Sequence, residues 1–196
     1  PVAIAMLVVA AVATGAALAA IDARATYGAR VTADEPQYLL SAISLGEDLD
    51  LDISDEIADR RYLPFHEIGL DPQTIALDET GREVSPHDPL LPILLTIPMS
   101  LGGWVAAKAA LAVVAGAVAA LTLWLAADRF GAPLWPAAAV VATCFAAPPF
   151  AAYGAQVYPA MPAALCVVGG VIAATAEPSR RAELTTVAAV VALPWL

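Results

Sequence analysis

Two adjacent carboxylates, Asp34 and Glu35, precede an apolar stretch and are the chain's strongest candidates for chemistry. Pro36 follows them, and proline suits the first turn of a helix because its missing N–H would have no partner there. The pattern predicts a helix from Pro36 to about Gly46, with the two acids in the cap region. The positive end of a helix favours ionised acids, and an ionised acid can accept a proton from a hydroxyl group. A general base and an ordinary helix cap both fit this spacing.

The same predicted helix carries an apolar stripe at helical spacing, so it can lie against membrane or protein. The stripe consists of Tyr38, Leu39, Ala42, Ile43 and Gly46.

Further candidates lie near the predicted membrane boundaries. His87 and Asp88 precede a predicted surface helix, where a protonated histidine can pair with a phosphate, although a solvated loop histidine fits equally. Lys108 is a second candidate for a phosphate, but it lies about one turn into a span and can also extend to water. Gln156 and Tyr158 can line a sugar pocket, although interfacial tyrosines are common without one.

The segment 48–56, DLDLDISDE, alternates acids with apolar residues and suggests a calcium loop. An EF-hand loop requires glycine at its sixth position and glutamate at its twelfth, and the sequence has Ile53 at the sixth and no glutamate at the twelfth. The alternation fits an extended, half-buried segment better. We therefore predict no metal ligand here. The sequence also lacks the H-E-x-x-H, G-x-S-x-G and P-loop motifs.

The composition indicates a membrane protein. Apolar residues make up 60% of the chain and charged residues 14%, whereas soluble domains carry about 25% charged residues. Of the nineteen acids, sixteen lie within 22–90, together with five of the nine Lys and Arg residues. This acidity excludes a nucleic acid partner, which would require the opposite charge. We expect an all-α polytopic membrane protein with a large, partly helical loop at 22–89.

Apolar runs place the predicted spans. A helix covering all of 90–127 would be about 57 Å long, nearly twice the hydrocarbon thickness. The segment PMSLGG (98–103) should therefore break it and leave a surface helix at about 89–99. A cleaved signal peptide is the alternative for the first span, but the basic n-region is absent. The predicted spans are about 2–21, 104–126, 133–148, 158–176 and a truncated one from about 184, so we expect a fragment of a longer protein.

Short loops predict the orientation. Arg129 lies in the loop at 127–133, and Arg180 and Arg181 lie in the loop at 177–183, whereas 149–157 carries no Lys or Arg. The positive-inside rule places the first two loops in the cytoplasm and the long loop at 22–89 outside.

Four stretches, in this order, resemble the N-terminal part of the GT-C membrane glycosyltransferases, which use polyprenyl-phosphate-linked sugars. This broad group includes protein O-mannosyltransferases and lipid A aminoarabinose transferases, and the resemblance covers the whole chain. The stretches are DEPQYLLSAISLGEDLDLD (34–52), SPHDPLLPILLTIPMSLGG (85–103), YGAQVYPAMPAAL (153–165) and LPWL (193–196).

The resemblance implies that Asp34 matches the catalytic acid of the first external loop. Glu35 would assist, by orienting the acceptor or by contacting a metal in members that use one. Some positions depart from the pattern: Ala33 replaces a frequent glycine, Gln37 a frequent histidine, Asp88 a proline and Ala160 a frequent acid. The last departure removes a potential metal ligand, so no cofactor is certain, although a divalent metal is possible.

The resemblance implies an inverting glycosyltransferase in the plasma membrane, which acts on the extracytoplasmic face. Its donor would be a polyprenyl-phosphate-linked sugar and its acceptor a glycan, lipid or protein; the Ala, Val, Asp and Arg bias suits a high-GC bacterium. The binding candidates would be His87, Asp88, Lys108, Tyr38 and Gln156. The alternative is a noncatalytic membrane transporter or lipid-binding scaffold subunit, which the scarcity of ionisable residues in the spans does not favour.

Overall fold

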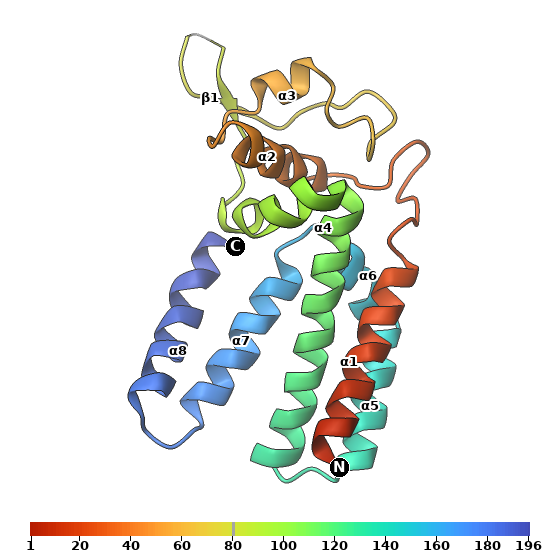
Figure 1. Ribbon diagram of the computed structural model, residues 1–196, viewed down its shortest axis with the longest axis vertical. Helices are drawn as coiled ribbons and strands as arrows, with labels where there is room; N and C mark the ends of the chain where they lie inside the picture. The colour runs from red at the N-terminus through yellow and green to blue at the C-terminus, as the bar shows by residue number, and fades with distance from the viewer. Residues whose placement is uncertain (80) are drawn as a thin grey trace. The chain divides into compact units, whose positions relative to one another are not determined.

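The chain is mostly helical in the computed structural model, which describes residues 1–79 and 81–196 (Figure 1). Thr80, in the predicted long loop, lies outside the described residues. Strands β1 (Ile75–Ala76) and β2 (Glu83–Val84) pair antiparallel. The helices are α1 (Val2–Ala19), α2 (Glu35–Glu47), α3 (Ser54–Ala58), α4 (Leu90–Trp124) continued by a π-helical turn (Leu125–Arg129), α5 (Leu134–Ala146), α6 (Phe150–Ala155), α7 (Ala160–Ala174) and α8 (Arg180–Ala192) followed by a 3-10 turn (Leu193–Trp195).

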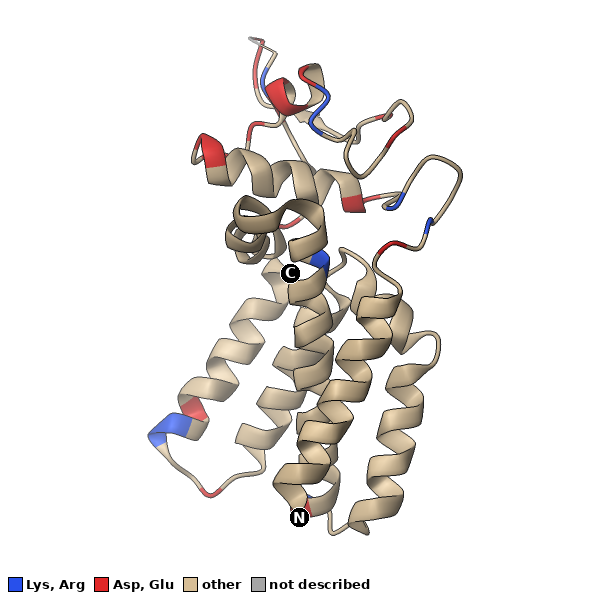
Figure 2. Cartoon of the chain, turned by 45° about the vertical axis from the view of Figure 1, so that its right-hand side comes forward, with Lys and Arg blue, Asp and Glu red and all other residues tan. Residues whose placement is uncertain are grey.

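These elements form two compact units, and α4 contributes to both. The helical unit consists of Pro1–Ala20, Leu111–Ala155 and Pro159–Leu196, and the loop unit consists of Ile21–Ala110 and Gln156–Tyr158. Figure 2 shows that most Asp and Glu residues belong to the loop unit, whereas the helices of the helical unit are almost uncharged.

Among the described residues, two helical segments are long and apolar enough to cross a membrane: α1, and Leu90–Arg129. The apolar helices α5 and α7 have 13 and 15 residues. These helices are shorter than the predicted spans at 133–148 and 158–176, and a full crossing takes about 20 residues. The prediction of a helical fold is confirmed, and its membrane character is supported by the two long segments.

The core of the helical unit is built from small and branched side chains of α1, α4 and α5. Buried residues recur every fourth position along α1, at Ala5, Val9, Ala13 and Ala17, so one narrow stripe faces the other helices. Opposite this stripe, α1 leaves large apolar side chains such as Leu7 exposed.

Helix α4 passes very close to α1 at Gly116. A Cβ atom on Gly116 would lie 2.1 Å from Thr14 Oγ1 and 2.9 Å from the Ala10 carbonyl oxygen. Side chains cannot approach this closely, so the helix packing depends on the absence of a side chain at this position.

The predicted break in the long apolar run is confirmed, although it lies at the glycines rather than at the proline. The helical assignment continues through Pro98, and the backbone leaves helical geometry at Gly102 and Gly103. Gly103 has φ 63°, which glycine adopts without the steric cost of a Cβ atom. The predicted surface helix at 89–99 therefore extends from Leu90 to the two glycines.

Helix α2 matches the predicted helix at 36–46 but is not amphipathic. Residues 35–44 are all buried, including polar residues on the side opposite the predicted stripe. These polar groups find partners within the loop unit: Ser44 Oγ donates to the carbonyl oxygens of Asp50 and Asp52. On the other side, a Cβ atom on Gly46 would lie 2.8 Å from Ser100 Oγ of α4. Residues 35–44 are therefore enclosed by protein, which is one of the two surroundings that the sequence allowed for this helix.

Two other predicted boundaries are corrected. The segment 149–157, predicted as a loop, contains the short helix α6. Helix α8 begins at Arg180, before the predicted start at about 184, because Ser179 caps it: Ser179 Oγ accepts a hydrogen bond from Ala182 N at 3.2 Å.

Gly116→Ala should destabilise the chain by about 1–3 kcal/mol, because the new methyl group overlaps with Thr14 and with the backbone of α1. The measurement is thermal unfolding of the full chain in detergent. Gly169→Ala in α7 is the control, since no atom lies within 4 Å of its Cβ position and alanine favours helix. Equal unfolding temperatures for the two variants would contradict the close approach of α1 and α4.

Candidate functional site

A tight turn leads into α2 and positions the two adjacent acids. Glu35 N donates to the Thr32 carbonyl oxygen at 3.2 Å, so Ala33 and Asp34 are the central residues of a four-residue turn. Ala33 has φ 53°, and Asp34 has φ −84° and ψ −16°. These φ values match a type II′ turn, in which glycine is usual at the first central position. Ala33 thus has a backbone conformation that favours glycine. Glycine is frequent at this position in the GT-C group that the sequence resembles.

Asp34 is at the N-cap position of α2, yet its side chain makes no capping hydrogen bond. N-cap residues usually have extended backbone, which lets the side chain reach back to the first free N–H groups. The backbone of Asp34 is helical instead. The interpretation of Asp34 as an ordinary helix cap is therefore wrong, and its carboxylate, 35% exposed, stays available at the surface of the loop unit.

Glu35 is the structural member of the pair. Its side chain is 1% exposed, and both carboxylate oxygens accept hydrogen bonds from backbone N–H groups. Oε2 accepts from Thr32 N at 3.0 Å, and Oε1 accepts from Val157 N at 2.7 Å. Glu35 thereby fixes the turn that carries Asp34 and ties residues 156–158 to it. This geometry gives Glu35 a positioning role, distinct from the direct assistance that the resemblance implies.

Asp34 faces His87 across the loop unit. The distance from His87 Nε2 to Asp34 Oδ1 is 3.7 Å, and Nε2 is buried without a hydrogen-bond partner among the described residues. The His87 ring stacks on Tyr38, with ring centroids 4.9 Å apart. Tyr158 lies edge-on to Tyr38 at 6.4 Å. The structure therefore brings together residues from three distant segments of the chain.

The pKa of the Tyr38 hydroxyl reflects its burial and the acids close to it. Burial, and then the negative charges of Asp34 and Asp88, raise the pKa of the Tyr38 hydroxyl. Tyr38 therefore stays neutral near the two acids and can donate a hydrogen bond. Asp88 acts on the Tyr38 hydroxyl only through its charge, and the Asp88 side chain is exposed.

A pocket of about 390 Å³ adjoins His87 within the loop unit. The pocket lining combines the hydroxyl groups of Ser41 and Ser85 with apolar side chains, which suits a ligand with both polar and apolar parts. It is lined by Ser41, Leu51, Leu77, Val84, Ser85, His87, Pro89 and Pro92.

Lys108 is separated from solvent, contrary to the expectation that its side chain extends to water. It is 3% exposed, its Nζ donates to the Arg30 carbonyl oxygen at 2.9 Å, and it lies 5.8 Å from the Trp104 ring centroid. The Arg30 guanidinium in turn pairs with Asp22 and Glu67. Lys108 therefore anchors the segment around Arg30 to α4.

Glu67 lies at the centre of a surface cluster of charged side chains that includes Arg24 and Arg30. Arg24 donates to both Glu67 oxygens at 2.9 Å, and Arg30 also donates to it. These hydrogen bonds lower the pKa of Glu67 to about 2. The cluster is exposed, so it contributes little to stability.

Two further residues take part in this arrangement in ways that the sequence did not predict. Gln37 is buried; with its amide nitrogen toward the Ala33 and Asp34 carbonyls, at 3.0 and 3.1 Å, its oxygen accepts from Gln73 N at 3.1 Å. Val157 contributes only a backbone N–H, which no side-chain pattern can reveal. Gln156 is half-buried and precedes Val157, and the described contacts give its side chain no place among Asp34, Tyr38 and His87.

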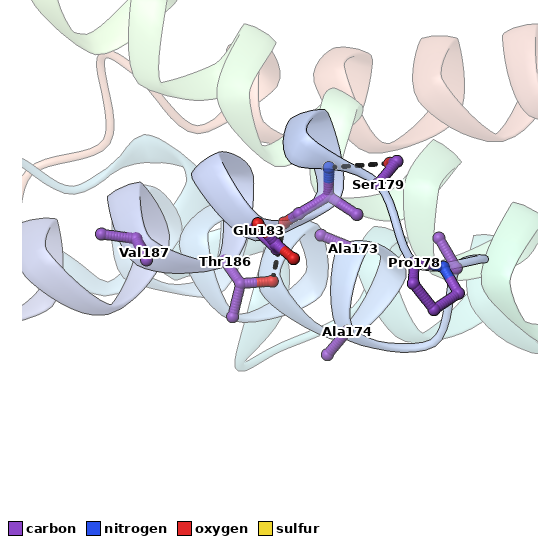
Figure 3. Close-up of a pocket in the computed structure, with 9 residues that line it drawn as sticks. Ala173, Ala174, Pro178, Ser179, Glu183, Thr186 and Val187 are labelled. Carbon is purple, nitrogen blue, oxygen red and sulfur yellow. Dashed lines mark hydrogen bonds between the residues drawn. The ribbon is translucent and has the colours of Figure 1, made fainter.

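A second pocket, of about 360 Å³, lies in the helical unit between the end of α7 and the start of α8 (Figure 3). Two of its polar groups are engaged in the helix itself: Ser179 Oγ accepts from Ala182 N, and Thr186 Oγ1 donates to the Ala182 carbonyl oxygen. Glu183 also lines this pocket, which contains none of the candidate residues predicted from the sequence.

No family model, curated protein or solved structure matches this chain in the three comparisons.

Glu35→Gln should destabilise the chain by about 2 kcal/mol, because the amide NH₂ must face one of the two backbone N–H groups that the carboxylate satisfies. Unfolding in denaturant measures the loss. Glu47→Gln, at the other end of α2, is the matched control: it removes an exposed pair with Arg61 and should cost less than about 1 kcal/mol. Equal losses would contradict the structural role of Glu35.

Ala33→Gly should stabilise the chain by about 0.5–1 kcal/mol, because it removes a left-handed alanine at the cost of some chain entropy. The control is Ala58→Gly at an exposed helical position of α3, where glycine should destabilise by a similar amount. Thermal unfolding of both variants gives the comparison, and destabilisation by both would refute the strained turn.

Proposed function

We propose that the chain is part of an integral membrane glycosyltransferase that transfers a sugar from a polyprenyl-phosphate donor to an acceptor hydroxyl group. The observation that carries this proposal is the carboxylate of Asp34. It is partly exposed, makes no capping hydrogen bond and faces His87 beside a pocket. The order of the four sequence stretches that resemble the GT-C group supports the same assignment.

In this proposal Asp34 is the general base. Its ionised carboxylate accepts the proton of the acceptor hydroxyl as the acceptor oxygen forms a bond to the anomeric carbon of the sugar. The bond from that carbon to the phosphate oxygen breaks, and the lipid phosphate leaves with the electron pair. Attack opposite the leaving group inverts the configuration at the anomeric carbon.

The surroundings of Asp34 suit this reaction. The Glu35 carboxylate fixes the turn, so Asp34 needs no reorganisation to meet the acceptor. Protonated His87 can offset the charge of Asp34 or of the donor phosphate, and Tyr38 orients the imidazole ring by stacking. The nearby pocket provides room for the acceptor or for the sugar.

We also propose that the enzyme is a multi-pass protein of the plasma membrane, with the segment 22–89 on the extracytoplasmic face. The two long apolar segments support membrane insertion. The large apolar side chains that α1 and α8 leave exposed, such as Leu7 and Val190, support contact with lipid. The arginines at 129, 180 and 181 support the orientation.

The test is turnover by the purified full-length protein with a panel of polyprenyl-phosphate sugars. Asp34→Asn should lower the turnover rate by about 10²–10⁴-fold, because the amide cannot accept the proton, while donor binding persists. Asp71→Asn, which removes an exposed acid elsewhere in the loop unit, is the matched control and should keep full turnover.

Two results would contradict the proposal. Full turnover by a folded Asp34→Asn variant would exclude Asp34 as the base. Failure of the wild-type protein to bind any donor of the panel would favour a noncatalytic scaffold.

A further inference from the structure

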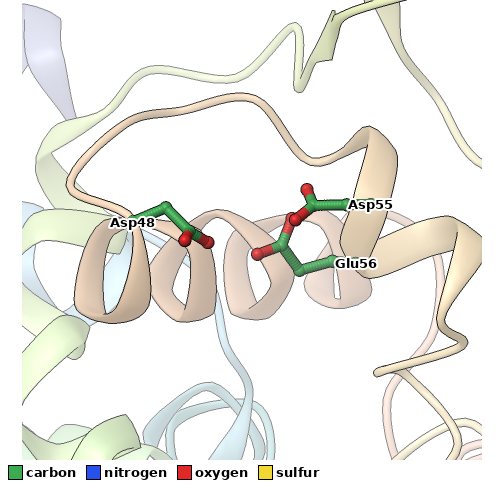
Figure 4. Close-up of side chains that lie close together, drawn as sticks. All are labelled: Asp48, Asp55 and Glu56. Atoms are coloured by element: carbon green, nitrogen blue, oxygen red, sulfur yellow. The ribbon is translucent and has the colours of Figure 1, made fainter.

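Three carboxylates meet where the end of α2 approaches α3. Asp48 is the C-cap residue of α2, and Asp55 and Glu56 lie in the first turn of α3. Each offers one oxygen atom, and these three atoms lie within 4.8 Å of one another. Figure 4 shows the three side chains directed toward one another.

The loop between the two helices is fixed by hydrogen bonds that do not involve these three side chains. Ser44 Oγ in α2 donates to the Asp50 and Asp52 carbonyl oxygens. Asp52 Oδ1 accepts from Ser54 N and from Glu83 N, at 3.1 and 3.0 Å. These hydrogen bonds therefore hold the loop in place without using the side chains of Asp48, Asp55 or Glu56.

Glu56 is an independent sign that a ligand belongs here. Its side chain is 2% exposed, and its Oε2 atom has no hydrogen-bond partner among the described residues. A buried carboxylate without a partner is costly, so natural proteins pair such a group with a cation or a hydrogen-bond donor.

The neighbouring arginine does not supply the missing charge. The Arg61 guanidinium donates to both oxygens of Glu47, at 2.8 and 2.5 Å, and only its backbone N–H meets Glu56, at the carbonyl oxygen. The Arg61 guanidinium is therefore not the partner of the Glu56 carboxyl group.

We propose that Asp48, Asp55 and Glu56 bind a calcium ion that joins the end of α2 to α3. Calcium takes six to eight oxygen ligands at 2.3–2.6 Å, so oxygens on opposite sides of one ion lie about 5 Å apart, and the three carboxylate oxygens fit one coordination shell. An all-oxygen set disfavours zinc, which prefers nitrogen and sulfur. Asp48 and Asp55 are exposed, so water can complete the shell.

This ion is structural. Asp48 and Asp34 are at opposite ends of α2, which is about 20 Å long at 1.5 Å per residue. The ion would hold one end of α2 while Glu35 holds the other. The inference is independent of the proposed glycosyltransferase activity.

The experiment is thermal unfolding of the full chain in detergent, in EDTA and in 5 mM CaCl₂, with NaCl at equal ionic strength as the salt control. Calcium should raise the Tm of the wild-type protein by about 5 °C, as expected when the ion binds only the folded state. Calorimetric titration should show one calcium ion per chain, with Kd of order 10⁻⁴ M.

Glu56→Gln should abolish the calcium-dependent shift while its Tm in EDTA stays at or above the wild-type value, because the amide replaces a buried acid whose Oε2 atom has no hydrogen-bond partner among the described residues. This second readout distinguishes loss of the site from loss of the fold. Asp59→Asn is the matched control: it removes an exposed acid three residues further along and should keep the shift.

The absence of a calcium shift in the wild-type protein would overturn the inference and favour a proton shared between Asp55 and Glu56. An equal loss of the shift in Asp59→Asn would also overturn it, because the response would then reflect general charge screening. These outcomes are independent of turnover, so failure here and failure of the proposed activity are distinguishable.

Discussion

The buried carboxylate of Glu35 connects two parts of the chain that are 122 residues apart. One of its oxygens accepts a hydrogen bond from the backbone N–H of Thr32, and the other accepts one from the backbone N–H of Val157. An acid can be buried at low cost only when both oxygens are satisfied, so the positions of these two segments are coupled. The orientation of Asp34 follows from this coupling, since Asp34 lies inside the turn that Glu35 holds.

The two adjacent acids illustrate how neighbouring residues of the same type acquire opposite roles. Glu35 is buried and accepts hydrogen bonds from backbone N–H groups, whereas Asp34 is partly exposed and faces His87. The helical backbone of Asp34 prevents it from capping the helix that it precedes. A side chain that makes no capping hydrogen bond is available for chemistry, and this is the physical basis for the proposal that Asp34 is the base.

Local patterns predicted the helices well, because they depend on apolar runs and on residues such as Pro36 and the pair Gly102–Gly103. The meeting of Asp34 with His87 was not predicted, because the two residues are far apart in the sequence and no local pattern connects them. The partner of Glu35 could not be predicted, since a backbone N–H has no sequence signature. The burial of Lys108 was missed for a similar reason: its partner is the Arg30 carbonyl oxygen, 78 residues away. The meeting of Asp48 with Glu56 depends on the hydrogen bonds of the intervening loop.

The narrow stripe of α1 has a consequence for the order of events during biosynthesis. Helix α1 packs on α5 and α6, which the ribosome makes more than a hundred residues later. At about 5–20 residues per second, α1 must wait on the order of ten seconds for these neighbours. During that interval its alanine- and valine-lined stripe has no helix of this chain to pack on. The small side chains that later permit close packing offer little apolar area to an incorrect partner in the meantime.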